Sequence, residues 1–168
     1  MIRGGADLRV LIIDDNAQMR TIMGAVLGAA GVRTLHYAPD GRMGVRRVAE
    51  VEPDICFVDY EMPVMNGLDF VSEIRSQPAP VCFMPIVMLT GHSDAIRVNA
   101  ARDRGVTEFL AKPVTAQAIL GRLAAVIYRP RPFITSATYF GPDRRRNRAE
   151  PYCGPKRRAA ETVNTLEL

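Results

Sequence analysis

The segment ICFVD at residues 55–59 is a run of four apolar residues that ends on one carboxylate. A continuous apolar run of this length is typical of a β-strand that is buried on both faces. Two other segments have the same form, because VLIIDD at residues 10–15 and IVMLT at residues 86–90 are apolar runs that end on polar side chains. If these strands lie parallel and side by side, their last side chains meet at one edge of a sheet. The segment 55–59 therefore predicts both the core of the fold and the position of a site.

Strand and helix patterns alternate through the first 128 residues. The expected strands cover residues 10–13, 32–37, 55–59, 84–89 and 107–110, and helical patterns follow each of them. Asp15 or Asn16 can cap the first helix and Thr115 the last, while Gly31 and Gly105 end helices. Five strands that alternate with five helices predict an α/β fold, a doubly wound parallel sheet covered on both faces. Ligands of such sheets bind beyond the carboxyl ends of the strands.

Asp14 and Asp15 follow the first strand directly and have two interpretations. Either acid can cap the next helix, which is a purely structural role. Two adjacent carboxylates raise one another's pKa, however, and this favours a bound cation. Carboxylate oxygens from Asp14, Asp15 and Asp59 suit Mg²⁺, with Mn²⁺ as a second candidate. A nucleotide-binding domain would instead need a phosphate loop rich in Gly, Ser or Thr at residues 14–16.

Lys112 follows the last strand and precedes Pro113. A lysine in this place is often a simple surface charge. Here it faces the same edge as three acids and the hydroxyl of Thr90, so a phosphoryl group entering the site would find ligands in a metal ion, Lys112 and Thr90.

Four motifs together resemble the receiver domain of two-component response regulators, the CheY-like family. They are VLIIDDN at residues 10–16, DYEMPVMNG at 59–67, MLTG at 88–91 and FLAKP at 109–113, and the resemblance extends over about three quarters of the chain. It implies a flavodoxin-like sheet with strand order 2-1-3-4-5 and five helices. It also implies a stand-alone receiver that signals through phosphorylation-gated protein contacts and catalyses only its own phosphorylation and dephosphorylation.

The resemblance assigns roles to the acids. Asp59 matches the phosphoacceptor, which takes a phosphoryl group from a sensor histidine kinase or a histidine phosphotransfer protein. Asp15 matches the direct Mg²⁺ ligand, Asp14 matches the acid that holds metal-bound water, and the backbone carbonyl of Glu61 would be a further ligand.

The remaining roles concern the phosphoryl group and the switch. Lys112 would pair with a phosphoryl oxygen, and Thr90 would move to hydrogen-bond another. Phe109 matches the aromatic side chain that turns inward as Thr90 moves. Pro113 would follow a cis peptide bond, which X–Pro bonds tolerate at a cost of about 0.5–1 kcal/mol.

The charge is concentrated after residue 128. Residues 1–128 carry 13 Lys and Arg against 14 Asp and Glu, whereas residues 129–168 carry 9 against 4. The positive charge that gives the chain its net charge of +4 therefore lies in residues 129–168. This division predicts a receiver domain over residues 1–128 and an Arg- and Pro-rich, largely irregular extension over residues 129–168. The extension lacks the periodic apolar residues of a DNA-binding output domain. The basic excess points to a partner of the tail.

The tail contains a repeat. YFGPDRR at residues 139–145 is echoed by YCGPKRR at residues 152–158. Arginine pairs can fork onto guanine and stack on bases, and the segment resembles the arginine-rich extension of CheY-like proteins that bind cyclic di-GMP and act on the flagellar motor. The candidate nucleotide ligands are Tyr139, Arg144, Arg145, Arg146, Arg148, Tyr152, Arg157 and Arg158. Other interpretations are a solvated basic tail, non-specific binding of nucleic acid, and docking on an acidic protein or membrane surface.

Several features favour a cytoplasmic protein. No apolar run approaches the roughly 20 residues of a membrane span, and residues 1–8 lack the apolar core of a secretory signal. The three cysteines, Cys56, Cys82 and Cys153, are odd in number and lack metal-site spacing, which is consistent with free thiols in a reducing compartment.

Overall fold

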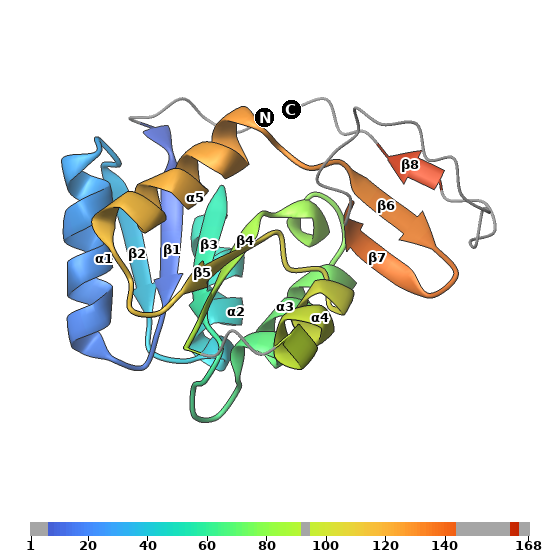
Figure 1. Ribbon diagram of the computed structural model, residues 1–168, viewed down its shortest axis with the longest axis horizontal. Helices are drawn as coiled ribbons and strands as arrows, with labels where there is room; N and C mark the ends of the chain where they lie inside the picture. The colour runs from blue at the N-terminus through green and yellow to red at the C-terminus, as the bar shows by residue number, and fades with distance from the viewer. Residues whose placement is uncertain (1–6, 92–94, 144–161, 165–168) are drawn as a thin grey trace.

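The computed structural model describes residues 7–91, 95–143 and 162–164, and its centre is a parallel sheet of five strands (Figure 1). The strand order is β2-β1-β3-β4-β5, which confirms the expected topology. The strands are β1 (Arg9–Ile13), β2 (Thr34–Ala38), β3 (Ile55–Asp59), β4 (Ile86–Thr90) and β5 (Glu108–Ala111). Every residue of β3 and β4 is buried, as their continuous apolar sequences predict.

Helices cover both faces of this sheet. They are α1 (Ala17–Ala29), α2 (Gly41–Val51), α3 (Gly67–Ser76), α4 (Ala95–Asp103) and α5 (Ala116–Tyr128). Alternate residues of the strands point to opposite faces, so the core has two halves. Val10, Ile12 and Phe57 pack with α1 and α5, whereas Leu11, Ile13 and Val58 pack with the helices of the other face. None of the described helices has the length and apolar character needed to cross a membrane.

The helix ends follow the local sequence signals. Asn16, not Asp15, caps α1, since its side chain accepts hydrogen bonds from the backbone of Gln18 and Met19. Thr115 caps α5 as expected. Beyond α1 and α4 the chain turns at Gly31 and Gly105, whose φ values of +94° and +91° lie in the left-handed region that glycine adopts at little cost.

The chain beyond α5 begins with regular structure. Strands β6 (Phe133–Ser136) and β7 (Tyr139–Pro142) form an antiparallel hairpin, and the backbone of β8 (Thr162–Asn164) pairs with the other edge of β6. The extension was expected to be largely irregular, and residues 133–136 and 139–142 depart from that expectation. Their β-branched and aromatic side chains favour strands. Residues 144–161 lie outside the described part of the chain, and the division into two domains at residue 128 stays a prediction.

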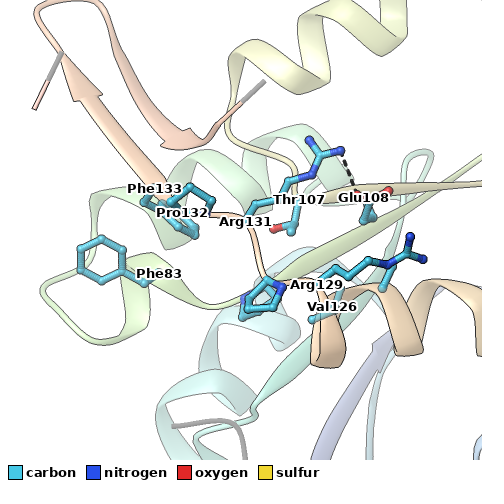
Figure 2. A pocket seen from close by; sticks show the side chains of 11 residues that line it. Phe83, Thr107, Glu108, Val126, Arg129, Arg131, Pro132 and Phe133 are labelled. Atoms are coloured by element: carbon cyan, nitrogen blue, oxygen red, sulfur yellow. Dashed lines mark ion pairs between the residues drawn. The ribbon is translucent and has the colours of Figure 1, made fainter. Parts of the chain in front are cut away.

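The hairpin packs against the amino-terminal end of the sheet, beside α3 and α4 (Figure 1). The ring of Phe83, in the short 3-10 helix η2 (Val81–Phe83), contacts the rings of Phe133 and Phe140 at centroid distances of 5.2 and 5.5 Å. In the linker before β6, Arg131 forms an ion pair of 2.9 Å with Glu108 of β5 (Figure 2). These contacts tie the hairpin to the core of the five-stranded sheet.

Candidate functional site

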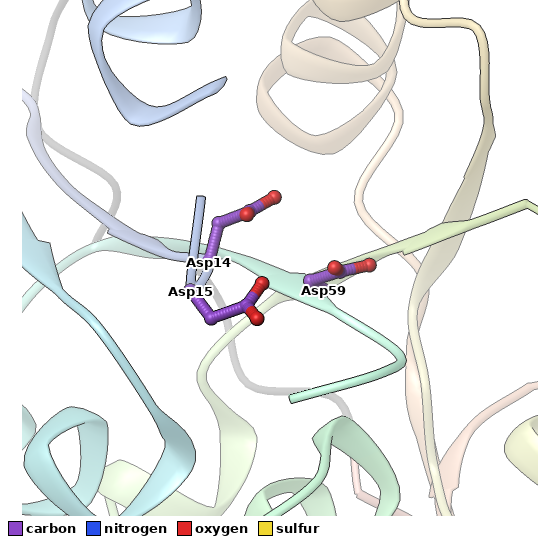
Figure 3. A group of neighbouring side chains, drawn as sticks. All are labelled: Asp14, Asp15 and Asp59. Carbon is purple, nitrogen blue, oxygen red and sulfur yellow. The ribbon is translucent and has the colours of Figure 1, made fainter. Parts of the chain in front are cut away.

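Three carboxylates meet at the carboxyl ends of β1 and β3 (Figure 3). Asp14 and Asp15 directly follow β1, and Asp59 is the last residue of β3. One oxygen of each lies within 4.8 Å of the others. Asp14 and Asp59 are buried, with 1% and 4% of their surface exposed, whereas Asp15 is exposed. The structure therefore brings together the three acids that the sequence singled out.

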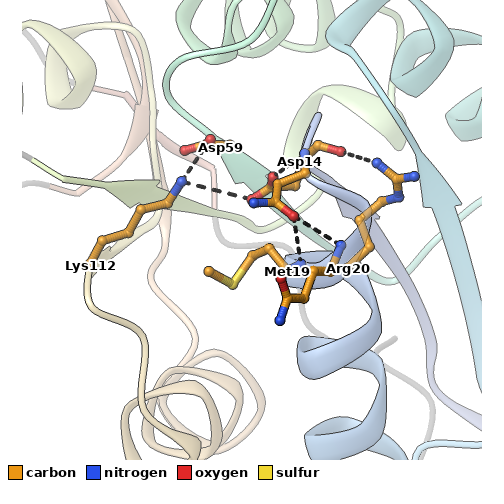
Figure 4. A network of polar contacts seen from close by, with 7 residues as sticks. Asp14, Met19, Arg20, Asp59 and Lys112 are labelled. Carbon is orange, nitrogen blue, oxygen red and sulfur yellow. Dashed lines mark hydrogen bonds and ion pairs between the residues drawn. The ribbon is translucent and has the colours of Figure 1, made fainter.

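Lys112 reaches into this cluster from the end of β5 (Figure 4). Its Nζ donates a hydrogen bond of 2.7 Å to Oδ2 of Asp59 and lies 3.9 Å from Oδ2 of Asp14. Its backbone N–H donates to the carbonyl of Thr90 at 2.9 Å, and the peptide bond to Pro113 is cis, as expected. The lysine is the cation that offsets part of the repulsion between the two buried acids.

Asp14 is the most constrained of the acids. Burial raises the pKa of its carboxyl, a hydrogen bond from the backbone N–H of Asn16 lowers it, and the charge of Asp59 raises it again. Within the described residues, its Oδ2 is buried and has no hydrogen-bond partner. A buried oxygen acceptor without a donor costs free energy unless a cation or a water molecule satisfies it.

The donor set fits a divalent cation of the Mg²⁺ type. It consists of carboxylate oxygens alone, and these leave positions open for water and phosphate oxygens. Asp15 and Glu61 line the same surface hollow, together with Tyr60, Met62, Pro63, Asn66 and Leu68. The exposed acid and the loop after β3 thus border a hollow beside the acidic cluster.

Thr90 and Phe109 lie on neighbouring strands near the site. Thr90 is the buried last residue of β4 and pairs in register with Ala111, next to Lys112. Phe109 is half-buried and packs against the core on the face of α2, α3 and α4. Thr90 is at the edge of the site and Phe109 lies further back along β5, and the switch roles expected for them stay a prediction.

The structure adds two residues that the sequence reasoning had not assigned to the site. A Cβ atom at Gly67 would collide with the backbone carbonyl of Asp59, so only glycine lets the chain fold back this closely. The Asn66-Gly67 pair was the sequence signal for this tight turn, since Asn66 caps α3 and Gly67 is the first residue of the helix. Arg20 of α1 donates a hydrogen bond from Nη1 to the backbone carbonyl of Asp14.

The structure describes one of the eight candidate nucleotide ligands in the tail. Tyr139 is half-buried in β7, and its hydroxyl donates a hydrogen bond of 2.8 Å to the carbonyl of Pro142. The neighbouring Gly141 packs its backbone against Gly105 so closely that a Cβ atom would lie 2.8 Å from the Cα of Gly105. The residues YFGP therefore have a structural role in the hairpin. The candidate arginines and Tyr152 lie outside the described residues.

The family model for the response regulator receiver domain matches residues 10–124. Among curated proteins, the protein-glutamate methylesterase/protein-glutamine glutaminase of Treponema denticola is 34% identical over 110 residues, which are 64% of this chain and 29% of that protein. The DNA-binding response regulator MtrA of Mycobacterium tuberculosis is 30% identical over 121 residues, which are 72% of this chain and 51% of that protein. The chain spans about half or less of the length of these relatives.

Solved structures give the same result for the fold. The chemotaxis response regulator CheY4 of Vibrio cholerae superimposes with a TM-score of 0.67 at 31% identity, over 71% of this chain and 98% of that one. A response regulator of Chloroflexus aurantiacus superimposes with the same TM-score at 26% identity, over 73% of this chain. The part of the chain that these structures match is similar to a whole CheY-like protein.

Proposed function

The chain belongs to the response regulator receiver domain family, and from this membership and the geometry of its acidic site we propose that it accepts a phosphoryl group on Asp59. The donor would be a phosphohistidine on a sensor histidine kinase or a histidine phosphotransfer protein. The observation that carries the proposal is the contact of 2.7 Å between Lys112 and Asp59 within a cluster of three acids. A lysine in this position can stabilise the charge on the oxygens of a phosphoryl group during transfer.

The transfer is a nucleophilic displacement. An oxygen of the Asp59 carboxylate attacks the phosphorus, the P–O bond forms, and the P–N bond breaks. The imidazole nitrogen of the donor leaves with the bonding electron pair and takes a proton from solvent. In the reverse direction of the switch, water attacks the same phosphorus, and inorganic phosphate leaves as the carboxylate is restored. In both reactions Lys112 would orient the phosphoryl oxygens.

Asp14, Asp15, Asp59 and the backbone carbonyl of Glu61 would hold Mg²⁺ or Mn²⁺. When bound, the ion supplies positive charge between the carboxylates and the phosphoryl oxygens, which lowers the electrostatic barrier to transfer. Oδ2 of Asp14 is buried, accepts no hydrogen bond among the described residues and lies 3.9 Å from the Lys112 ammonium; it and the hollow beside Asp15 support this assignment. The backbone N–H of Asn16 donates a hydrogen bond of 2.8 Å to Oδ1 of Asp14, and this bond holds the Asp14 carboxylate in place beside Asp59.

The test is incorporation of phosphate from a small acyl phosphate, measured by intact mass with Mg²⁺ and with a chelator. We expect a single phosphorylation that requires the metal and is lost in Asp59→Asn. The matched control is Asp69→Asn, the same substitution at an exposed position of α3. Metal-independent labelling would contradict the metal assignment, and undiminished labelling of Asp59→Asn would contradict the choice of phosphoacceptor.

For the output, we propose phosphorylation-gated contact with a protein partner in the cytoplasm. Thr90 and Phe109 would reposition when Asp59 carries the phosphoryl group and so alter the face formed by α4, β5 and α5. The proposal assigns the chain no chemistry beyond its own phosphorylation and dephosphorylation. The buried free thiols of Cys56 and Cys82 are compatible with a reducing compartment.

A second candidate function concerns the repeat in the tail. The sequence of residues 139–158 repeats a Tyr, a Gly-Pro pair and an Arg pair at a spacing of 13 residues, and two such copies suit a ligand with two like halves. We propose as an alternative that this segment binds cyclic di-GMP and that the protein tunes a partner such as the flagellar motor. Calorimetric titration of the full chain with the dinucleotide tests this, with GMP as the control. Absence of binding at tens of micromolar would remove the alternative and leave the phosphorylation proposal untouched.

A further inference from the structure

The β6–β7 hairpin contacts the same strand that carries the switch residues. Glu108 is the first residue of β5, Phe109 is the second, and Lys112 directly follows the last. Lys112 is four residues beyond Glu108, which is about 13 Å at about 3.3 Å per residue. The anchor of the hairpin and the lysine at Asp59 are therefore joined by one short, stiff element.

The anchor is a charge cluster around Glu108. Arg131 of the linker lies 2.9 Å from one carboxylate oxygen of Glu108, and Arg122 of α5 lies 3.5 Å from the other. The side chains of Glu108 and Arg131 are 10% and 19% exposed, so water screens their attraction only in part. The Arg131 side chain also donates a hydrogen bond to the carbonyl of Asp143. One arginine thus links the start of β5 to both ends of the hairpin.

A second group of contacts holds the turn before β5. Arg75 of α3 donates from Nε to the carbonyl of Gly105 at 3.0 Å, and its guanidinium lies 5.1 Å from the centroid of the Phe133 ring. Gly141 of the hairpin packs against Gly105. The turn between α4 and β5 is therefore enclosed between α3 and the hairpin.

This packing is not close to optimal. Arg75 is buried, and its Nη2 has no hydrogen-bond partner among the described residues. Burial lowers the pKa of its guanidinium to about 10, which reflects the cost of covering a cation. A cavity of about 50 Å³ lies beside the linker, and its lining combines apolar residues such as Val126 and Phe133 with the charged residues Glu108, Arg129 and Arg131 (Figure 2). One guanidinium nitrogen without a hydrogen-bond partner and a cavity beside the linker both lower the free energy that docking contributes.

We propose that the hairpin is a strap on β5, which is docked when Asp59 is unmodified and loosened when Asp59 is phosphorylated. A phosphoryl group adds bulk and about −1.5 to −2 charges, so Lys112 must shift from its present contact and β5 shifts with it. Movement at Glu108 then strains the ion pair with Arg131. Because coupling between two sites is reciprocal, a loosened strap also favours the phosphorylated state. This inference rests on the proposed phosphorylation of Asp59.

Hydrogen exchange of the full chain tests the strap directly. The protein is phosphorylated with a small acyl phosphate, the phosphorylated fraction is measured by intact mass, and backbone exchange is compared at residues 133–142. We expect exchange there to accelerate about fivefold, the lower end of typical allosteric coupling. Complete phosphorylation with unchanged exchange would overturn the strap alone. Failure to phosphorylate Asp59 at all would overturn the proposed function and the strap with it.

The reciprocal effect is tested with Arg131→Gln. This substitution removes the link while Arg122 still pairs with Glu108, so no buried carboxylate is left without a cation. The control is Arg129→Gln, which removes the same charge from an exposed position of the same linker. We expect Arg131→Gln to be phosphorylated about fivefold faster than the control, by the same coupling. Equal rates in the two variants would overturn the proposal.

Discussion

The two ends of the parallel sheet are built in opposite ways. At the carboxyl ends of the strands, three acids crowd around one lysine, and a buried carboxylate oxygen has no hydrogen-bond partner among the described residues. At the amino ends, three aromatic rings and an ion pair fasten a hairpin to the core. The repulsion within the acidic cluster lowers the free energy of unfolding unless a bound cation offsets it. The aromatic contacts and the ion pair of the hairpin raise the free energy of unfolding.

Each end of the sheet also has one feature that is typical of the opposite end: the acidic site has a tight backbone contact, and the hairpin contact has a buried charge. The acidic site includes a packing constraint, since Gly67 must lie against the backbone of Asp59. The hairpin dock includes a buried cation, Arg75, whose partners in the described structure are three backbone carbonyls and an aromatic ring. Substitutions at the acidic site should therefore change chemistry more than stability, and substitutions at the dock should do the reverse.

The largest effect is expected for Lys112→Met. The substitution removes the cation beside Asp59, and loss of one such electrostatic contact typically costs about 10²–10³-fold in rate. Phosphate incorporation from an acyl phosphate, followed by intact mass, measures it. Arg42→Met on the exposed side of α2 removes the same charge elsewhere and should keep the parent rate. An unfolded Lys112→Met variant would show that the lysine holds the fold and would remove the contrast between the two ends.

Phe133→Ala tests the other end. Phe133 is 8% exposed and packs against Phe83, Phe140 and Arg75, and truncation of such a residue costs about 3 kcal/mol in the free energy of unfolding. Chemical denaturation measures the loss, and phosphate incorporation should proceed at least as fast as in the parent. Tyr128→Ala is the control, because that aromatic side chain is 80% exposed and its loss should cost less than about 0.5 kcal/mol. If Phe133→Ala kept its stability but lost phosphate incorporation, the hairpin would support the chemistry of the site and not the stability of the fold.

The two ends also differ in how well the sequence predicts them. The apolar strands β1, β3 and β4 and the acids that follow them have sequence signals that are local and unambiguous, so the sheet, the capping residue Thr115 and the meeting of Asp14, Asp15 and Asp59 could all be predicted. The roles of these residues came from the family motifs. The difference in burial between adjacent Asp14 and Asp15 could not be predicted, because it depends on where α1 begins.

The sequence did not lead us to expect the β6–β7 hairpin, because the arginine-rich composition of the tail indicated an irregular segment. Residues 133–136 (FITS) and 139–140 (YF) have the β-branched and aromatic side chains of strands. The Ala137-Thr138 loop between them lacks the Asn or Gly that usually marks a two-residue hairpin loop, and the arginines that follow suggested a charged tail. The close packing of Gly141 on Gly105 is a contact between residues far apart in the chain, and no local pattern indicates it.

Binding of Mg²⁺ gives a stability test that involves the acidic end alone. A ligand that binds only the folded state raises the free energy of unfolding by about 2.7 kcal/mol at a hundred times its Kd. We expect such a gain for the parent protein and the loss of most of it in Asp15→Asn, since Asp15 is exposed and its replacement should disturb the fold little. Thermal unfolding with Mg²⁺ and with a chelator measures both, and Asp69→Asn should keep the full gain. Equal gains in all three proteins would place the ion elsewhere.

The smallest effect concerns backbone strain beside the acidic site. Val64 lies in the loop after β3, is 74% exposed and has a φ of +68°, a left-handed conformation that is costly for a β-branched residue. Asn tolerates this conformation better, so Val64→Asn should raise the free energy of unfolding by about 1 kcal/mol, as measured by chemical denaturation. Val64→Ala removes the same methyl groups but lacks the polar side chain with which Asn forms local hydrogen bonds in the left-handed region, and it should give a smaller gain. If Ala and Asn stabilise equally, exposure of the valine side chain and not its backbone explains the gain, and the strain at this end of the sheet is negligible.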